Sequence, residues 1–203
     1  ECEIIGSDRL TDIGLLKISA SNLVPISMGN SGDIKVGDLA VAIGHPLTLG
    51  AAPTVTTGVV SALERRLDVG SENMNSGVTL FGLIQTDAPI TRGSSGGALL
   101  NSNGELIGIT TAIATADVGA EGLGFAVPVN LALGIADDLL KEGRILHAFL
   151  GILGAQHFDT ADDGARIFSG VVIQELYGPN NELFAIGKAG AIPGDIIKKI
   201  NGV

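Results

Sequence analysis

The sequence predicts a mainly β protein. Between residues 36 and 127, short apolar runs alternate with turn signals, a pattern typical of antiparallel sheets. The chain contains 30 Gly and 7 Pro among its 203 residues, and many of them lie in these turns. Only 3% of the residues are aromatic, so we expect a core of Val, Ile, Leu and Ala. The length allows one to two domains.

The strands are expected in the following order. Residues 1–18 alternate toward a strand that ends at Asp12 and resumes from Ile13 to Ile18. Six further strands are predicted, at 39–44, 54–64, 78–86, 97–101, 104–113 and 122–127. The pair Asn103-Gly104 is a strong hairpin signal. Six strands are enough to close one antiparallel barrel.

One helix is predicted after these strands. Pro128 ends the sheet, and Asn130 is placed to cap a helix that begins at Leu131. The helix is expected to run to about Glu142, because Gly143 is a typical residue just past a helix end.

Composition excludes several classes of function. The chain has 22 acidic and 12 basic side chains, a net charge of −10, and no Lys/Arg stripe, so no nucleic-acid partner is expected. No apolar run approaches the roughly 18 residues that a membrane span needs, and residues 1–20 lack the features of a secretory signal. The single Cys2 excludes an internal disulfide. No metal site and no cofactor is predicted.

The strongest candidate for chemistry is the sequence Gly-Ser-Ser-Gly-Gly at 93–97. A hydroxyl is a poor nucleophile unless its backbone exposes it and nearby N–H groups stabilise the oxyanion; flanking glycines permit both. Ser95 is therefore the candidate nucleophile, and the N–H groups of Gly93 and Ser95 are the candidate oxyanion hole. The alternative is a plain Gly/Ser turn between two strands.

The surrounding segments favour the catalytic interpretation. Together with 93–97, the segments Thr-Asp-Ile-Gly-Leu-Leu-Lys-Ile, Ile-Gln-Thr-Asp-Ala-Pro-Ile and Gly-Leu-Gly-Phe-Ala-Val-Pro resemble, in this order, the protease domain of the HtrA/Deg family. These are trypsin-like serine proteases with C-terminal PDZ domains. The resemblance covers residues 1 to about 145 closely and the remainder more loosely. One departure is Ser94, where the family usually has Asn. The side chain at this position is not one of the catalytic groups.

The resemblance implies a trypsin-like double β-barrel over residues 1–145, with the second barrel complete and the first mostly missing. The N-terminal portion of a PDZ domain is implied over 146–203, so we expect a fragment truncated at both ends. In that portion, Leu150, Gly151 and Ile152 correspond to the loop that receives a peptide's C-terminal carboxylate, while the next strand pairs with the peptide. The sequence Gly-Leu-Gly-Phe at 122–125 is also a signature of the PDZ carboxylate-binding loop. Here it is expected in the last strand of the barrel, because it leads directly into Ala-Val-Pro and the predicted helix.

The resemblance also implies a catalytic triad in the chain order His, Asp, Ser. Asp12 and Ser95 fit the second and third places, and the histidine is expected ahead of residue 1. The alternative for Asp12 is a turn-forming aspartate. The alternative base is His45, which lies between Asp12 and Ser95 in the sequence. The other two histidines, His147 and His157, are expected to be solvated surface residues.

The residues before the nucleophile predict its specificity. Trypsin has an aspartate six residues before its serine to bind Lys or Arg, whereas this chain has Pro89, so a basic side chain would be buried without a counter-ion. By resemblance, the S1 pocket is walled by Ile90, Ile113 and Leu123, which favours small or medium aliphatic side chains. The alternative is that each is plain core. Asp87 is a rival acid for the triad, with a structural hydrogen bond as its expected role.

The function implied by the resemblance is that of an ATP-independent serine endopeptidase of protein quality control. It would cut unfolded or damaged polypeptides in the periplasm or another extracytoplasmic compartment, as a homo-oligomer of three subunits or a multiple of three. The alternative is a catalytically silent relative that acts as a chaperone or binds peptides. A histidine-containing stretch encoded ahead of Glu1 decides for the protease, and the 203 residues alone are expected to be inactive.

Overall fold

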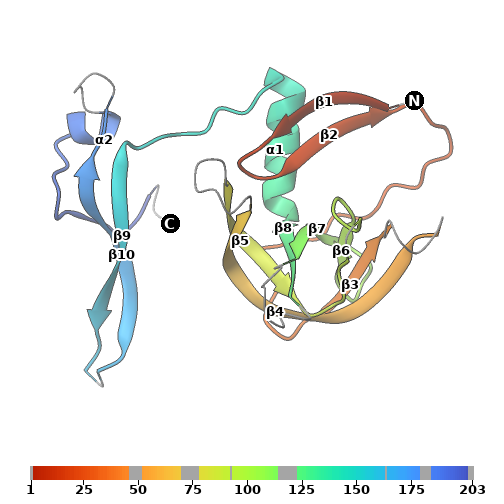
Figure 1. Cartoon of the computed structure of the whole chain (residues 1–203), viewed down its shortest axis with the longest axis horizontal. Helices are drawn as coiled ribbons and strands as arrows, with labels where there is room; N and C mark the ends of the chain where they lie inside the picture. Colours follow the sequence, from red (N-terminus) through yellow and green to blue (C-terminus); the bar gives the residue numbers. More distant parts are fainter. Residues whose placement is uncertain are drawn as a thin grey trace. The chain divides into compact units, whose positions relative to one another are not determined.

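Six strands of the N-terminal part close into an antiparallel barrel, with neighbours in the order β3-β4-β5-β8-β7-β6 (Figure 1). The computed structural model describes residues 2–45, 52–69, 78–91, 93–113, 123–162, 164–178 and 184–200, without the side chains of 112 and 113. The barrel strands are β3 (Leu39–Gly44), β4 (Thr54–Val69), β5 (Val78–Thr86), β6 (Ala98–Leu100), β7 (Leu106–Ile113) and β8 (Gly124–Pro128). The prediction of one closed six-stranded barrel is therefore confirmed.

The hairpin signal between β6 and β7 is also confirmed. Gly104 has a φ of 76°, a left-handed conformation that glycine adopts without steric cost, and its N–H donates to the Asn101 carbonyl at 3.1 Å. The strands on either side pair Ala98 with Ile109. Farther along, β8 pairs with β5 and β7, which confirms that the segment ending Gly-Phe-Ala-Val-Pro belongs to the barrel.

A separate two-stranded sheet precedes the barrel. Strand β1 (Cys2–Asp8) pairs antiparallel with β2 (Ile13–Ile18), and residues 9–12 form the turn between them. The prediction that the first strand extends to Asp12 was wrong, because the chain reverses direction after Asp8. Asp12 thus lies in the turn, directly before β2.

The helix α1 (Val129–Glu142) follows β8 without a break. The prediction that Asn130 caps a helix starting at Leu131 was wrong, because Pro128 occupies the N-cap position in an extended conformation and Asn130 lies inside the helix, where its own N–H donates to Ser31 Oγ at 3.1 Å. The Asn130 amide instead donates to Asn30 Oδ1 at 2.7 Å, which ties the β2–β3 connection to the start of the helix. Gly143 ends α1 with a φ of 67°, as predicted.

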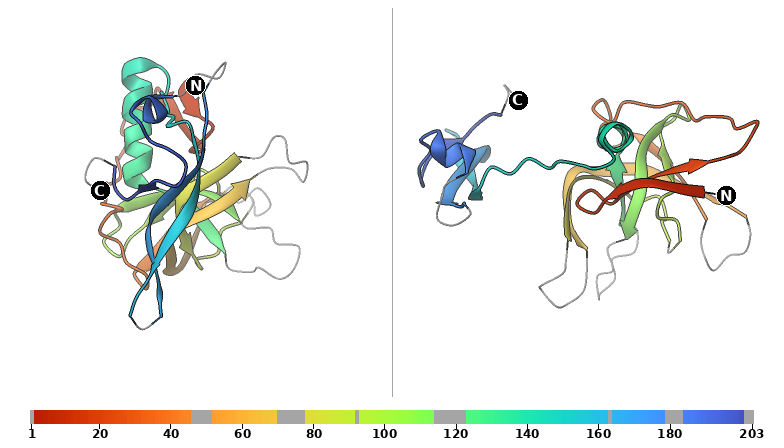
Figure 2. Two further views of the ribbon diagram at one scale, coloured as in Figure 1. Left: turned by 90° about the vertical axis from the view of Figure 1, so that its left-hand side faces the viewer. Right: turned by 90° about the horizontal axis from the view of Figure 1, so that it is seen from above.

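Helix α1 packs against both the β1–β2 hairpin and the barrel strands β7 and β8 (Figure 2). Its buried residues Ile135 and Leu139 share one apolar cluster with Ile13 of β2 and with Phe125 of β8. The contact with β1 is close: a Cβ added at Gly6 would lie 2.8 Å from Leu139 Cδ2, so this position needs glycine or a shift of the leucine. The helix therefore fixes the hairpin, and the turn that carries Asp12, against the barrel.

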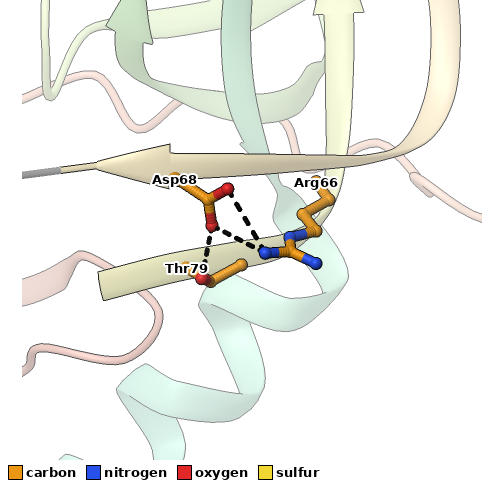
Figure 3. Close-up of polar contacts among 3 residues, drawn as sticks. All are labelled: Arg66, Asp68 and Thr79. Atoms are coloured by element: carbon orange, nitrogen blue, oxygen red, sulfur yellow. Dashed lines mark hydrogen bonds and ion pairs between the residues drawn. The ribbon is translucent and has the colours of Figure 1, made fainter. Parts of the chain in front are cut away.

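Polar pairing supports the far end of β4, which continues five residues beyond the predicted end at 64. Thr79 Oγ1 donates to Asp68 at 2.5 Å, and Arg66 Nη2 contacts the same carboxylate at 3.1 Å (Figure 3). Two contacts hold the pKa of Asp68 below its ordinary value: the hydrogen bond from Thr79 has the larger effect, and the hydrogen bond from Arg66 has the smaller one. Because the folded pKa is lowered, any stabilisation is present above the unfolded pKa and is lost as pH falls through the folded value. Both charges are exposed, so the contribution to stability is small.

The chain folds as two compact units, Glu1–Ile145 and Leu146–Val203. The second unit contains β9 (Ile152–Thr160), β10 (Arg166–Leu176), the short helix α2 (Ala185–Lys188) and β11 (Ile196–Ile197). Its sheet has the order β11-β10-β9, so β9 is an edge strand of the described sheet. Ile173 of β10 is buried. A PDZ domain for this unit stays a prediction.

Candidate active site

Ser95 lies in a turn just before β6, and its side chain is exposed. Gly93 and Gly96 on either side have φ values of 95° and 83°, which only glycine adopts readily. The chain therefore turns twice around the serine and presents it to solvent, the geometry that the flanking glycines suggested.

The ends of β3 and β7 hold this turn in place. The Ser94 carbonyl accepts hydrogen bonds from Thr110 Oγ1 at 2.5 Å and from the Gly97 N–H at 3.0 Å. A Cβ added at Gly97 would lie only 2.3 Å from the Ile43 carbonyl oxygen, so no other residue fits there without movement of β3. Ser94 itself is buried. The candidate nucleophile Ser95 is thus held on a fixed backbone, which is what a catalytic turn requires.

The two predicted oxyanion donors have no acceptor in the part of the chain that the structure describes. Among the described residues, neither the Gly93 nor the Ser95 N–H donates to a protein acceptor, whereas the Ser94 N–H between them donates to the Thr91 carbonyl at 2.9 Å. Unused N–H groups beside a nucleophile are the donors that an oxyanion needs. Their role stays a prediction.

Thr111 of β7 links the two predicted catalytic residues. Its Oγ1 donates to Asp12 Oδ2, and its carbonyl accepts a hydrogen bond from Ser95 Oγ at 2.6 Å. The structure therefore brings Asp12, from the β1–β2 turn, next to the turn of Ser95. In a trypsin-like triad, the aspartate orients the base that takes the proton from the serine, so the two groups have to lie near one another.

Comparison with known proteins agrees with this geometry. Residues 1–109 match the family described as the trypsin-like peptidase domain. Over 211 residues, the chain is 43% identical to the periplasmic pH-dependent serine endoprotease DegQ of Escherichia coli (strain K12), covering 100% of this chain and 42% of DegQ. The chain belongs to the HtrA/Deg family of trypsin-like serine proteases. The family resemblance and the trypsin-like fold expected from the sequence are thereby confirmed.

Other members of the HtrA/Deg family give the same result. The periplasmic serine endoprotease DegP of the same organism is 39% identical over 205 residues, covering 100% of this chain and 40% of DegP. The HtrA-type protease AlgW, solved with a tripeptide, superimposes with a TM-score of 0.73 at 34% identity, covering 99% of this chain and 63% of AlgW. The chain spans about two fifths of the length of DegQ and DegP.

Thr111, which contacts both candidate catalytic residues, was not singled out from the sequence. It is 8% exposed and stands beside Thr110 in a strand that is otherwise apolar or glycine. Buried polar side chains are nearly always hydrogen-bonded. Two adjacent threonines within such a strand were therefore the available signal that something polar lies against β7.

The two alternatives to the triad residues are not supported. Asp87 Oδ1 accepts the Val59 N–H at 2.7 Å, which confirms the structural role expected for it. His45 is exposed after β3, and no hydrogen bond within the described residues joins it to Ser95. His147 is exposed as expected. His157 differs, because it lies in β9 with its side chain 35% exposed and 3.5 Å from Asp159.

The predicted S1 residues are only partly described. Ile90 is 8% exposed and packs in the barrel core, where its Cδ1 would be 2.6 Å from a Cβ added at Gly124. Leu123 packs against a different apolar cluster, which includes Ile13 of β2 and buried residues of α1. The Ile113 side chain lies outside the described residues. The S1 pocket of these three residues therefore stays a prediction.

The predicted carboxylate loop runs into the start of β9, with Leu150 and Gly151 before the strand and Ile152 as its first residue. Gly151 has a φ of 76°, and a Cβ there would lie 2.5 Å from Phe184 Cδ2, so the loop requires glycine at this position. Its carbonyl accepts the Tyr177 N–H at 2.7 Å. Leu150 is exposed, and Ile152 begins the edge strand. Peptide binding by this loop stays a prediction.

Within the described ranges, no group of three or more His, Cys, Asp or Glu side chains is placed to hold a metal ion. In the same part of the chain, no helix combines the length and apolar character needed to cross a membrane.

Proposed function

We propose that this chain carries most of the catalytic site of an extracytoplasmic serine endopeptidase of protein quality control. The observation that supports it most directly is the exposed Ser95 between two left-handed glycines, joined through Thr111 to Asp12. The periplasmic proteases DegQ and DegP, of which this chain is a relative, are named as serine endoproteases.

The proposed reaction is acyl transfer. Ser95 Oγ attacks the scissile carbonyl while a histidine from residues ahead of Glu1 takes its proton. Asp12 accepts a hydrogen bond from that histidine, which fixes its tautomer and stabilises the imidazolium. The Gly93 and Ser95 N–H groups donate to the oxyanion. The histidine then protonates the leaving amine, and water hydrolyses the acyl-enzyme.

We propose unfolded or damaged polypeptides as substrates, with a small or medium aliphatic side chain before the cleaved bond. Peptide C-termini would bind at Leu150, Gly151 and Ile152, and their strand would pair with the edge of β9. A homo-oligomer, a trimer or a multiple of it, is proposed for the complete enzyme. The edge position of β9 and the named HtrA-type protease AlgW with bound peptides support the peptide-binding part.

A fluorophosphonate probe tests the proposed activity, because it reacts with an activated serine and not with a merely exposed one. A longer form that includes the residues ahead of Glu1 should be labelled at Ser95, whereas the 203-residue chain and a Ser95→Ala variant should not. No labelling of the longer form would favour the catalytically silent relative. Strong labelling of the 203-residue chain would mean that His45 or another base serves Ser95.

Specificity gives a separate test. Replacing Ile113 with Asp in the longer form should lower kcat/KM for cleavage after Val by roughly 10- to 200-fold, because the carboxylate would face an apolar side chain. Ile192→Asp, at an exposed position of the second unit, is the matched control and should have no effect. Peptide libraries measure the preference. Cleavage by the unmodified enzyme mainly after Lys or Arg would contradict the pocket.

A further inference from the structure

The turn between β1 and β2 is held by a buried carboxylate. Asp8, the last residue of β1, is 8% exposed. Its Oδ2 accepts two hydrogen bonds from one residue, the Thr11 N–H at 3.1 Å and Thr11 Oγ1 at 2.5 Å. An aspartate that bonds the chain three residues ahead closes a turn and fixes the peptide plane of the residue it holds.

The next residue after that fixed peptide is Asp12. Its φ of 59° is left-handed, a conformation that few residues other than glycine adopt and in which Asp is enriched. Residues with this backbone conformation persist where the surrounding structure holds them. The Asp12 side chain is exposed, and Thr111 Oγ1 is the hydrogen-bond donor to its carboxylate. A shift of the turn would move the carboxylate away from that donor.

Asp8 is itself attached to a rigid frame. It pairs with Ile13, which is buried in the same apolar cluster as Ile135 and Leu139 of α1. Packing of this kind resists small displacements, because protein interiors are close-packed. Asp8 thus connects the fixed frame of the hairpin and helix to the exposed carboxylate of Asp12.

We propose that Asp8, through its hydrogen bonds to Thr11, is the positioning residue that sets the backbone conformation and the place of Asp12. This inference rests on the proposed function, since Asp12 is the triad aspartate of the proposed reaction. A misplacement of about 1 Å in a catalytic constellation costs on the order of 100-fold in rate. Because Asp8 is buried, its effect should fall on kcat and leave substrate binding unchanged.

The kinetic test uses the longer form. Asp8→Ala removes the acceptor and Thr11→Val removes one donor with little change of shape; each should lower kcat roughly 10- to 100-fold while KM stays as it is. Thr11→Ser, which keeps both donors, should retain most of the activity. Arg9→Ala, in the same turn at an exposed position, is the matched control. Unchanged kcat in folded Thr11→Val would overturn the proposal, even if Asp8→Ala fails to fold.

A double-mutant cycle separates positioning from general damage. In an Asp12→Ala background, adding Thr11→Val should cost no further activity, because the two residues act as one unit. A full additional loss would show that Thr11 acts elsewhere and would overturn the proposal. If the unmodified longer form is no more active than its Ser95→Ala variant, the proposed function fails instead.

A spectroscopic measurement on the 203-residue chain does not depend on activity. The Asp12 backbone coupling constant and Cα chemical shift should indicate a left-handed conformation in the unmodified chain and in Thr11→Ser. Both should change in Thr11→Val and Asp8→Ala, while resonances of α1 stay in place. An unchanged Asp12 signal in Thr11→Val would overturn the inference and leave the proposed function standing.

Discussion

Replacing Ser95 with Ala in the longer form should reduce the turnover of casein-like substrates by about 10⁴- to 10⁶-fold. The reason is chemical: alanine has no hydroxyl to form the acyl-enzyme, while the backbone of the turn should stay in place. The substitution removes the hydrogen bond from Ser95 Oγ to the Thr111 carbonyl, but the turn keeps its backbone and threonine contacts to Ser94, Gly96 and Gly97. Substrate binding should therefore persist. Cleavage assays and a binding measurement with the same unfolded substrate separate the two effects.

Ser102→Ala is the matched control for this substitution. Ser102 is an exposed serine in the β6–β7 turn, and its replacement should leave turnover unchanged. Turnover in Ser95→Ala close to that of the unmodified enzyme would show that another group is the nucleophile, and the triad proposed here would have to be abandoned.

The barrel was predictable from the sequence because its determinants are local. Each strand has its own apolar run, and the turns between them contain residues with a fixed conformational preference. Gly104 and Gly143 both adopt the left-handed conformation that their positions suggested. For such elements, the neighbouring residues already determine the backbone, and tertiary packing selects the same conformation.

The errors occurred where a distant residue decides the local structure. Asn130 is a good capping residue by type, but its side chain bonds to Asn30, which lies far away in the sequence. Strand β4 continues through Arg65 and Arg66, whose charges hide the apolar alternation; pairing with β5 stabilises that part. Neither contact is visible within a short window of sequence.

The candidate site also combines a part determined by neighbouring residues with a part that depends on distant contacts. The turn around Ser95 follows from its own glycines, and the sequence indicated it directly. The link between Asp12 and Ser95 depends on Thr111, which the fold brings between two segments far apart in the chain. Resemblance supplied the pairing of Asp12 with Ser95, whereas only the structure revealed the threonine that joins them.

Asp12→Asn in the longer form should lower kcat by about 10⁴-fold with little change in the fold. The substitution keeps the shape of the side chain, and its amide oxygen can still accept the hydrogen bond from Thr111 Oγ1. The amide N–H₂ then faces the histidine and donates to it. The histidine nitrogen on that side therefore loses its proton, and the nitrogen facing Ser95 carries one and cannot take another.

The pH dependence of Asp12→Asn tests whether the loss comes from the wrong histidine tautomer or from a change in the turn. If the loss comes from the wrong tautomer, kcat should recover as the pH rises and hydroxide replaces the histidine as base, and a crystal structure should show Thr111 still bonded to residue 12. Asp137→Asn, which breaks only a surface ion pair with Lys141 on α1, is the matched control and should keep full activity. Unimpaired turnover in Asp12→Asn would mean that Asp12 is only a turn residue of the β1–β2 hairpin, because a structural aspartate in a left-handed turn is replaced by asparagine with little cost.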